Sequence, residues 1–264
     1  MQVSEAPVLF DVAGDLARIT LNRPEVGNAI DLSMARALFE VATRCLTDAS
    51  IRCVVLTGAG RLFCAGGDVD LFRSSSDNVD ALLSDLAGTL HAALAALARM
   101  PKPLLVLVNG PAAGAGLSLA IMGDVVLSSA SAHFTAAYGG LGLTPDGGMS
   151  WWLPRLVGLR KAQEIILTDR RIKSAEAEAI GLVTRVVADG TLASEGELVA
   201  CNLAKAATAA LGAARSLLRT SFETSYETQL ANELQSIVRA GGSSDCREGL
   251  AAYFEKRSPD FGPL

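Results

Sequence analysis

The sequence predicts an α/β fold that continues into a helical C-terminal part. Short apolar strands alternate with amphipathic helices through most of the chain, and glycine-rich turns follow several of the strands. From about residue 196 onward, only helical periodicity follows. The chain has 264 residues, half of them hydrophobic, so it can bury a full core. We therefore expect an α/β core over residues 1–195 and a helical region over residues 196–264.

The first expected elements are a β-hairpin, a helix and a strand. Residues 8–12 and 16–21 flank Gly14-Asp15, and two apolar runs around such a pair indicate a hairpin. A helix is expected over residues 32–46, where apolar side chains recur at helical spacing. The apolar run of residues 51–57 then predicts the next strand.

A leucine-rich helix and a buried strand follow. The helix carries one apolar stripe, formed by Leu82, Leu86, Leu90, Leu94 and Leu97. Residues 104–108 predict a buried strand, which ends in a turn before a helix near residues 115–122. The uncharged stretch from Pro103 to Gly123 is about long enough to span a membrane, but its prolines and glycines favour strand, turn and helix instead.

The rest of the core is predicted to consist of short elements. Strands are expected over residues 125–128, 133–135 and 183–187, with a glycine-rich loop between residues 139 and 148. The spacing of Ser194 and Glu197 is that of a capping box, which predicts the start of the C-terminal helices there.

Composition argues against several classes of protein. The formal net charge of −5 argues against a nucleic-acid-binding face. The N-terminal segment lacks the basic and apolar runs of a signal peptide, and the five cysteines show no Cys-x-x-Cys spacing. A metal site is not expected, because neither of the two histidines lies near a cysteine or the other histidine. We expect a cytoplasmic protein without a nucleic-acid or membrane partner.

Two glycine-rich segments resemble common motifs without completing them. Gly58-Ala59-Gly60 follows a strand, as in a dinucleotide-binding turn, but Phe63 stands where that turn needs a third small residue. Gly116-Leu117-Ser118 resembles the nucleophile elbow of serine hydrolases, which also need a histidine later in the chain. The later histidine, His133, lies at a predicted strand edge, and His91 is expected at the surface or the core edge. We expect Ser118 to be a packing residue.

A third segment, Pro145-Asp146-Gly147-Gly148, is by itself a turn signal. Its surroundings are apolar, since residues 138–143 carry no charge and residues 149–153 begin a predicted helix. A carboxylate in such surroundings suits the removal of a proton from carbon. Asp146 is therefore a candidate catalytic base.

Several blocks together resemble the signatures of the enoyl-CoA hydratase/isomerase (crotonase) superfamily. They are residues 51–58 with 63–68, 102–116, 141–148, 179–183 and 247–259. The resemblance extends from about Val8 to the end of the chain. Within the superfamily it is greatest to the branch of 1,2-epoxyphenylacetyl-CoA isomerases of the phenylacetate pathway and Δ3-Δ2-enoyl-CoA isomerases.

The resemblance implies a ClpP-like spiral of ββα units and a C-terminal helical region that forms trimers. It also implies an acyl-CoA thioester as substrate, held by the core, and no separate cofactor, because coenzyme A is part of the substrate. By motif position, the backbone N–H groups of Gly67 and Ala115 would form an oxyanion hole for the thioester oxygen. Small residues at these positions would let the carbonyl approach the main chain.

The same resemblance assigns four residues to coenzyme A binding: Val26, Ala65, Asp68 and Lys256. Val26 and Ala65 would line the adenine pocket, and Lys256 would reach the phosphates. The implied assembly is a homotrimer or a dimer of trimers.

The chain departs from family hydratases at two positions. Those enzymes carry two glutamates that activate and protonate water, and the matching positions here are Ser118 and Tyr138. Asp146 instead matches the aspartate of the isomerase branch. We therefore expect an acyl-CoA thioester isomerase, which converts a 3-enoyl to a 2-enoyl thioester or a ring epoxide to an oxepin. Asp146 would move the proton along the acyl chain.

Three alternatives stay open from the sequence. The first is an enoyl-CoA hydratase that uses Asp146 and water, and the second is an acyl-CoA-binding protein without catalysis. The third is a serine hydrolase that acts through Ser118. Trp151 and Trp152 have two open roles, since they would either shape the acyl pocket or pack in the fold.

Overall fold

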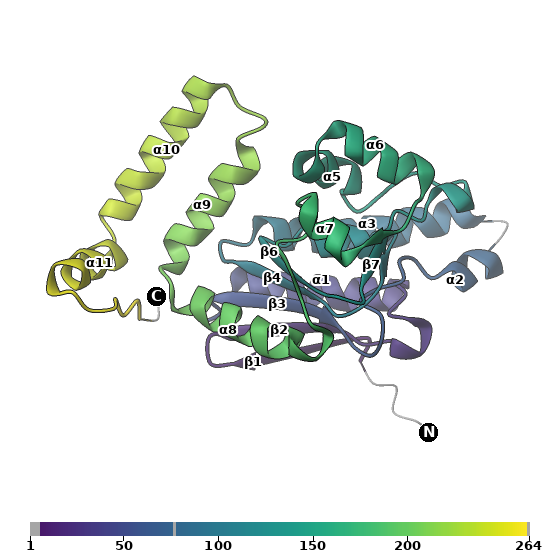
Figure 1. Cartoon of the computed structure of the whole chain (residues 1–264), viewed down its shortest axis with the longest axis horizontal. Helices are drawn as coiled ribbons and strands as arrows, with labels where there is room; N and C mark the ends of the chain where they lie inside the picture. Colours follow the sequence, from purple (N-terminus) through teal and green to yellow (C-terminus); the bar gives the residue numbers. More distant parts are fainter. Residues whose placement is uncertain (1–5, 76–77, 263–264) are drawn as a thin grey trace.

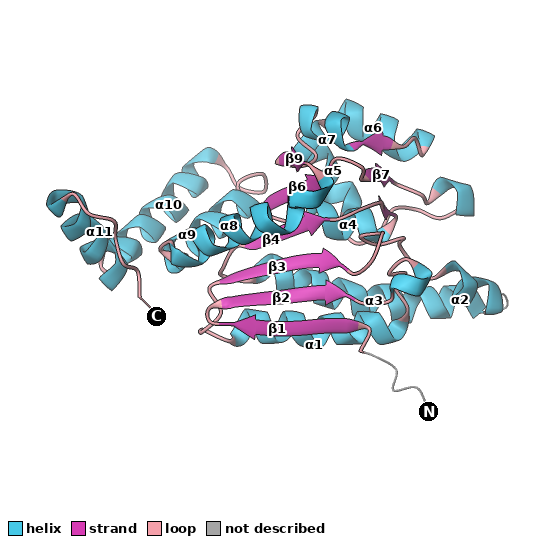
Figure 2. Ribbon diagram, turned by 60° about the horizontal axis from the view of Figure 1, so that its bottom comes forward, coloured by secondary structure: helices cyan, strands magenta, loops and turns pink. Residues whose placement is uncertain are grey.

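The main sheet has six strands in the order β1-β2-β3-β4-β6-β9 (Figure 2) in the computed structural model, which describes residues 6–75 and 78–262. The strands are β1 (Val8–Ala13), β2 (Leu16–Leu21), β3 (Cys53–Gly58), β4 (Leu104–Val108), β6 (Val125–Ser129) and β9 (Arg185–Val187). β1 pairs antiparallel with β2, and the other neighbours are parallel. Parallel neighbours require crossover connections, which here contain the helices that alternate with strands in the sequence.

Helices cover both faces of this sheet. α1 (Leu32–Thr47) and α3 (Val79–Arg99) pack against each other over one face, and α8 (Leu192–Lys205) covers the other (Figure 2). Alternate residues of β3 and β4 enter the two cores on opposite sides. Both faces of these strands are therefore buried, which explains their continuous apolar runs.

A layer of short elements follows the carboxyl ends of the parallel strands. It contains a second sheet in the order β5-β7-β8, made of β5 (Ala112–Ala113), β7 (His133–Thr135) and β8 (Ile172–Lys173). The other helices of the core are α2 (Val69–Ser74), α4 (Ala115–Ile121), α5 (Met149–Val157), α6 (Leu159–Thr168) and α7 (Ser174–Ala179). Short 3₁₀ helices are η1 (Pro24–Val26), η3 (Gly139–Leu141) and η4 (Asp189–Thr191).

The strongest sequence signals are confirmed. The predicted strands over residues 104–108 and 133–135 match β4 and β7, and Gly14 turns the β1–β2 hairpin with a φ of 62°. The uncharged stretch from Pro103 to Gly123 forms β4, β5 and α4, as expected. α3 is long and apolar enough to cross a membrane by length and composition alone, but its stripe from Leu86 to Leu97 is buried in the core.

The predicted capping box at the start of the C-terminal helices is wrong. α8 begins at Leu192, and Ser194 lies inside its first turn, where its hydroxyl donates to the carbonyl of Thr191. α8 packs on β3, β4 and β6, so the predicted boundary at residue 195 falls inside a helix of the core. The part that leaves the core begins after Lys205.

This C-terminal arm consists of α9 (Thr208–Thr220), α10 (Tyr226–Gly241) and α11 (Ser244–Glu255), and it projects away from the sheet (Figure 1). Its first helix is fixed by Arg215, whose guanidinium donates to the carbonyls of Ala98 and Met100 at 2.8 and 2.7 Å. The segment after α11 is fixed by the buried Arg52, which donates to the carbonyl of Gly262 at 2.5 Å. Both ends of the arm are therefore attached to the core.

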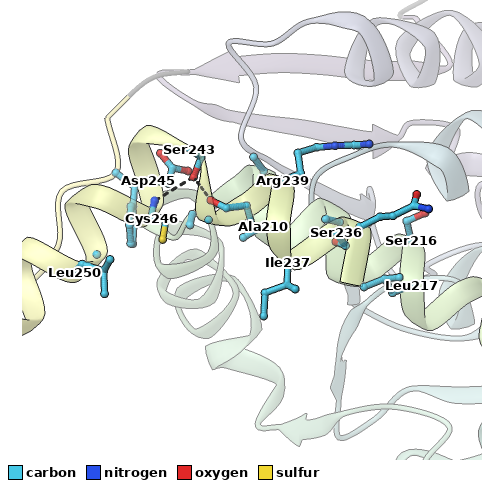
Figure 3. Close-up of a pocket in the computed structure, with 18 of the residues that line it drawn as sticks. Ala210, Ser216, Leu217, Ser236, Ile237, Arg239, Ser243, Asp245, Cys246 and Leu250 are labelled. Atoms are coloured by element: carbon cyan, nitrogen blue, oxygen red, sulfur yellow. Dashed lines mark hydrogen bonds between the residues drawn. The ribbon is translucent and has the colours of Figure 1, made fainter. Parts of the chain in front are cut away.

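The arm carries large apolar side chains on its surface. They are Leu218, Phe222, Tyr226, Leu230, Leu234, Ile237, Val238, Leu250, Tyr253 and Phe254. Its three helices border an open cavity of about 690 Å³, whose lining includes Leu217, Ile237 and Leu250 (Figure 3). The buried Oδ2 of Asp245, at the same cavity, has no hydrogen-bond partner within residues 6–75 and 78–262. A single chain thus leaves much of the arm's apolar surface uncovered.

Three buried thiols make the stability of the fold sensitive to alkaline pH. Burial raises the pKa of Cys45 from an ordinary value of 9.0 to about 11, and those of Cys53 and Cys64 to about 12. Above pH 9 the unfolded chain loses these protons while the folded chain keeps them. We expect the free energy of unfolding to fall between pH 9 and about 12, by at most about 1.4 kcal/mol per pH unit for each thiol.

Urea denaturation at successive pH values from neutral to about 11 measures this slope. The Cys53→Ala variant is the matched control, and it should show a shallower decline because one of the three thiols is gone. A free energy of unfolding that stays constant across the alkaline range would contradict the prediction.

Candidate active site

A cavity of about 450 Å³ lies beyond the carboxyl ends of β3 and β4. α3 forms one wall through Leu83, Leu86 and Leu90, and the loops that precede α2 and α4 form the other. Tyr138, Thr144 and Asp146 bring polar side-chain atoms to this largely apolar lining. An apolar cavity with a few converging polar groups is the usual form of a site for a small organic group.

Two backbone segments meet at the wall opposite α3. Gly66 has a φ of 98°, and a Cβ at this position would lie 2.9 Å from the carbonyl oxygen of Ala113 and 3.5 Å from the Cα of Gly114. Only glycine allows this contact, and the next residues, Gly67 and Ala115, both line the cavity. Within the described part of the chain, neither of their backbone N–H groups donates to a protein acceptor. Two such donors beside one cavity can bind one oxyanion.

A buried asparagine fixes the segment that contains Gly67. Asn28 has a left-handed φ of 57°, a conformation that asparagine tolerates better than most residues. Its side-chain amide donates to the carbonyls of Ala59 and Leu62 at 2.9 and 2.8 Å, and its Oδ1 accepts from the backbone N–H of Arg23 at 2.9 Å. These bonds hold the loop after β3 from the inside.

Asp146 is surrounded by three side chains from distant parts of the fold. Its Oδ1 accepts a hydrogen bond from the hydroxyl of Tyr138 at 2.5 Å, and its Oδ2 lies 3.4 Å from Nε2 of His91 on α3. Its backbone carbonyl accepts from the hydroxyl of Ser118 on α4 at 2.9 Å. Gly147 and Gly148 follow with φ values of 62° and 82°, which allow the sharp turn into α5.

Tyr138 stays a hydrogen-bond donor to this carboxylate. Burial raises the pKa of Tyr138 well above its ordinary value, and the negative charge of Asp146 raises it further. The phenol therefore keeps its proton through the physiological range. Because the bond to Oδ1 is short and fixed, it orients the carboxylate toward the cavity and leaves Oδ2 as the other basic oxygen.

The structure brings most of the predicted site residues together. Gly67, Ala115 and Asp146 line the same cavity, and Ala65 lies at its edge with an exposed side chain. Val26 lies beside Ala65, because the backbone N–H of Ala65 donates to the carbonyl of the residue that follows Val26. The two residues assigned to the adenine pocket thus form one exposed surface next to the cavity.

Asp68 and Lys256 lie in different surroundings. Asp68 caps α2, a helix too short to show periodicity in the sequence, and its carboxylate lies 3.2 Å from the guanidinium of Arg23. The negative charge of Asp68 is therefore paired with an arginine of the same chain. Lys256 ends α11 on the arm, outside the residues that line the cavity of its own chain (Figure 1). A contact of Lys256 with coenzyme A stays a prediction.

Sequence reasoning missed two residues of the site and placed a third correctly. Nothing in the sequence around Asn28 signals that its side-chain amide donates to the carbonyls of Ala59, Leu62 and Phe63. His91 follows Leu90, which lines the cavity, so the apolar stripe itself was the available signal that this histidine lies near the cavity. Ser118 is fully buried, and its hydroxyl bonds to the carbonyl of Asp146, in line with the expected packing role.

The fold agrees closely with solved structures of one class, the crotonase fold. The crystal structure of an enoyl-CoA hydratase from Polaromonas sp. JS666 superimposes with a TM-score of 0.91 over 96% of this chain and 98% of that chain, at 32% sequence identity. This confirms the predicted α/β spiral with a helical C-terminal region.

The sequence comparisons agree with the structural one. The family model described as enoyl-CoA hydratase/isomerase matches residues 11–263. A probable enoyl-CoA hydratase of Rhodobacter capsulatus is 37% identical, and the 1,2-epoxyphenylacetyl-CoA isomerase of Escherichia coli is 38% identical. Each alignment covers 96% of this chain and 97% of the relative. The chain belongs to the enoyl-CoA hydratase/isomerase family, a family of enzymes.

Proposed function

We propose that the protein is an acyl-CoA thioester isomerase that moves a carbon–carbon double bond, with Asp146 as its base. The observation that carries the proposal is the position of Asp146, which lines the cavity that Gly67 and Ala115 also line. Tyr138 and Ser118 stand where family hydratases carry glutamates, and both bond to Asp146. The single carboxylate of Asp146 would thus take the place of the two glutamate carboxylates of family hydratases.

The reaction needs an oxyanion site and a base that both face the acyl chain. The backbone N–H groups of Gly67 and Ala115 would bind the thioester oxygen and stabilise the dienolate that forms when a C2 proton leaves. Asp146 would take this proton on Oδ2, because Oδ1 already accepts the hydroxyl of Tyr138. Return of the proton to C4 would convert a 3-enoyl thioester into the conjugated 2-enoyl thioester.

The remaining parts of the substrate would bind outside the acyl cavity. Val26 and Ala65 would contact the adenine of coenzyme A from the surface they share, and Lys256 of a neighbouring chain would contact its phosphates. We propose no cofactor beyond the coenzyme A of the substrate. The buried free thiols Cys45, Cys53 and Cys64 support a reducing compartment, in line with a cytoplasmic protein.

The proposed assembly is a homotrimer or a dimer of trimers, joined through the arm. Its exposed apolar side chains and the unpaired Oδ2 of Asp245 among the described residues support a partner for this surface. We expect sedimentation equilibrium to give three or six chains per particle. The double variant Leu234→Glu and Ile237→Glu should lower the mass, and a wild-type monomer at micromolar concentration would contradict the proposal.

Mass spectrometry of the product tests the isomerase directly. A 3-enoyl-CoA is incubated with the purified protein, the products are separated by chromatography, and their masses are measured. A conjugated isomer of unchanged mass supports the proposal. A 2-enoyl-CoA is incubated in parallel, and a product heavier by one water from it supports the hydratase alternative, which the name of the Rhodobacter relative favours. Free coenzyme A would indicate a hydrolase, and tight binding without conversion, also of a ring-epoxide thioester, would indicate a binding protein.

A further inference from the structure

The carboxylate of Asp146 lies between two cavities. The acyl cavity of about 450 Å³ is on one side. A second cavity of about 340 Å³ is lined by His91, Gly147 and Trp152, and the His91 imidazole joins it to Asp146. The side chain of His91 is half exposed, so this imidazole reaches solvent from a position beside the base.

The two oxygens of Asp146 are not equivalent. Oδ1 accepts the hydroxyl of Tyr138 at 2.5 Å, and that hydroxyl keeps its proton. A proton taken from the substrate therefore goes to Oδ2. This oxygen lies 3.4 Å from Nε2 of His91, a separation that a small side-chain rotation reduces to hydrogen-bond length.

The form of the His91 imidazole is fixed by a backbone group. The N–H of Gly147 donates to Nε2 at 3.1 Å, so Nε2 carries a lone pair and the ring hydrogen is on Nδ1. An imidazole in this form can accept a proton at Nε2 and release the one at Nδ1. Because Nε2 has a single lone pair, which here accepts the Gly147 N–H, the ring must turn this lone pair to Oδ2 before His91 receives the proton from Asp146.

We propose that His91 is a proton relay that exchanges the hydrogen held by Asp146 with solvent in the second cavity. The proposal rests on the proposed isomerase. The C2–H bond breaks, its electron pair stays in the dienolate, and the proton forms Oδ2–H on Asp146. That proton moves to Nε2 of His91 while the Nδ1 proton passes to water, and the reverse path returns a solvent proton to Oδ2. The hydrogen delivered to C4 then comes from water.

Charged side chains lie on both sides of the His91 imidazole. Arg99 of α3 and Arg219 of α9 line this cavity together with Glu223, and Asp146 and Tyr138 face His91 from the acyl side. Two guanidinium groups against one carboxylate give the solvent side a net positive charge.

A single turnover of a 3-enoyl-CoA in D2O tests the relay. Wild-type product should carry deuterium at C4. In His91→Gln, the amide oxygen can still accept from Gly147 but cannot pass a proton. We expect the labelled fraction of product to fall several-fold, and to fall by more than kcat does. His133→Gln is the matched control, because His133 on β7 is the other histidine of the chain, and its product should be labelled like the wild type.

An equal labelled fraction in wild type and His91→Gln would overturn the relay, and so would wild-type product without deuterium. The deuterium content of the recovered substrate distinguishes a failure of the relay from a failure of the proposed isomerase. Deuterium at C2 without migration of the double bond would contradict the isomerase, and loss of that exchange in His91→Gln would still support the relay. Neither migration nor exchange by the wild type would overturn both proposals.

Discussion

Replacing Asp146 by asparagine is expected to lower kcat for double-bond migration by about 10²–10⁴-fold, the usual contribution of a general acid–base group. The asparagine has the same shape, and its oxygen can still accept the hydroxyl of Tyr138, so the cavity should keep its form. What disappears is the oxygen that takes the C2 proton. KM should change far less than kcat, and steady-state rates with a 3-enoyl-CoA measure both.

Asp70→Asn is the matched control for this substitution. Asp70 lies on α2, whose Val69 and Phe72 line the cavity, and its side chain is 79% exposed, so this variant loses one negative charge without touching the base. Its rates should equal those of the wild type. A kcat of Asp146→Asn within a factor of about two of the wild type would remove Asp146 from the mechanism, whatever the product.

The second large effect is expected from Gly116→Ala, which separates the two segments that carry the oxyanion donors. A Cβ at residue 116 would lie 2.3 Å from the carbonyl oxygen of Cys64 and 2.7 Å from its Cβ. α4 or the Cys64 segment must move, and the N–H groups of Gly67 and Ala115 move with them. Loss of one such donor costs about 2.7–4 kcal/mol, roughly 10²–10³-fold in kcat.

The same methyl group should also destabilise the fold, since overpacking of a core costs about 1–3 kcal/mol. Gly88→Ala provides the contrast, because the new Cβ on α3 would meet nothing within 4 Å. It should raise the free energy of unfolding by about 0.5–1 kcal/mol and leave kcat unchanged. Wild-type kcat in Gly116→Ala would show that the spacing of the two segments does not govern catalysis.

The sequence predicted the elements whose pattern is carried by neighbouring residues. β4 is five consecutive apolar residues between turn signals, and α3 shows its stripe over many turns, so each could be located from local periodicity. α2 has only six residues, fewer than two turns, and it was missed. α8 was misplaced because Ser194 imitates a cap, while the contacts with β3 and β4 that fix this helix come from distant residues.

The site residues that occupy motif positions could be predicted from the sequence. The contacts that depend on the packing of distant elements could not. Gly67, Ala115 and Asp146 follow from the resemblance, and the structure places all three at one cavity. The contact between His91 and Asp146 joins α3 to the loop before α5, and no local pattern reports such a pair. Tyr138 looked like the loss of a family glutamate, whereas its hydroxyl holds the base.

The two arginines at the base of the arm limit how copies of this chain can associate. Arg215 holds α9 against the end of α3, and Arg52 holds the segment after α11 through the carbonyl of Gly262. The arm is therefore attached at both ends to the core of its own chain. Exchange of arms between two chains, as in domain swapping, would have to break both attachments first. Association by contact between preformed surfaces avoids this step, so assembly can proceed without unfolding the arm.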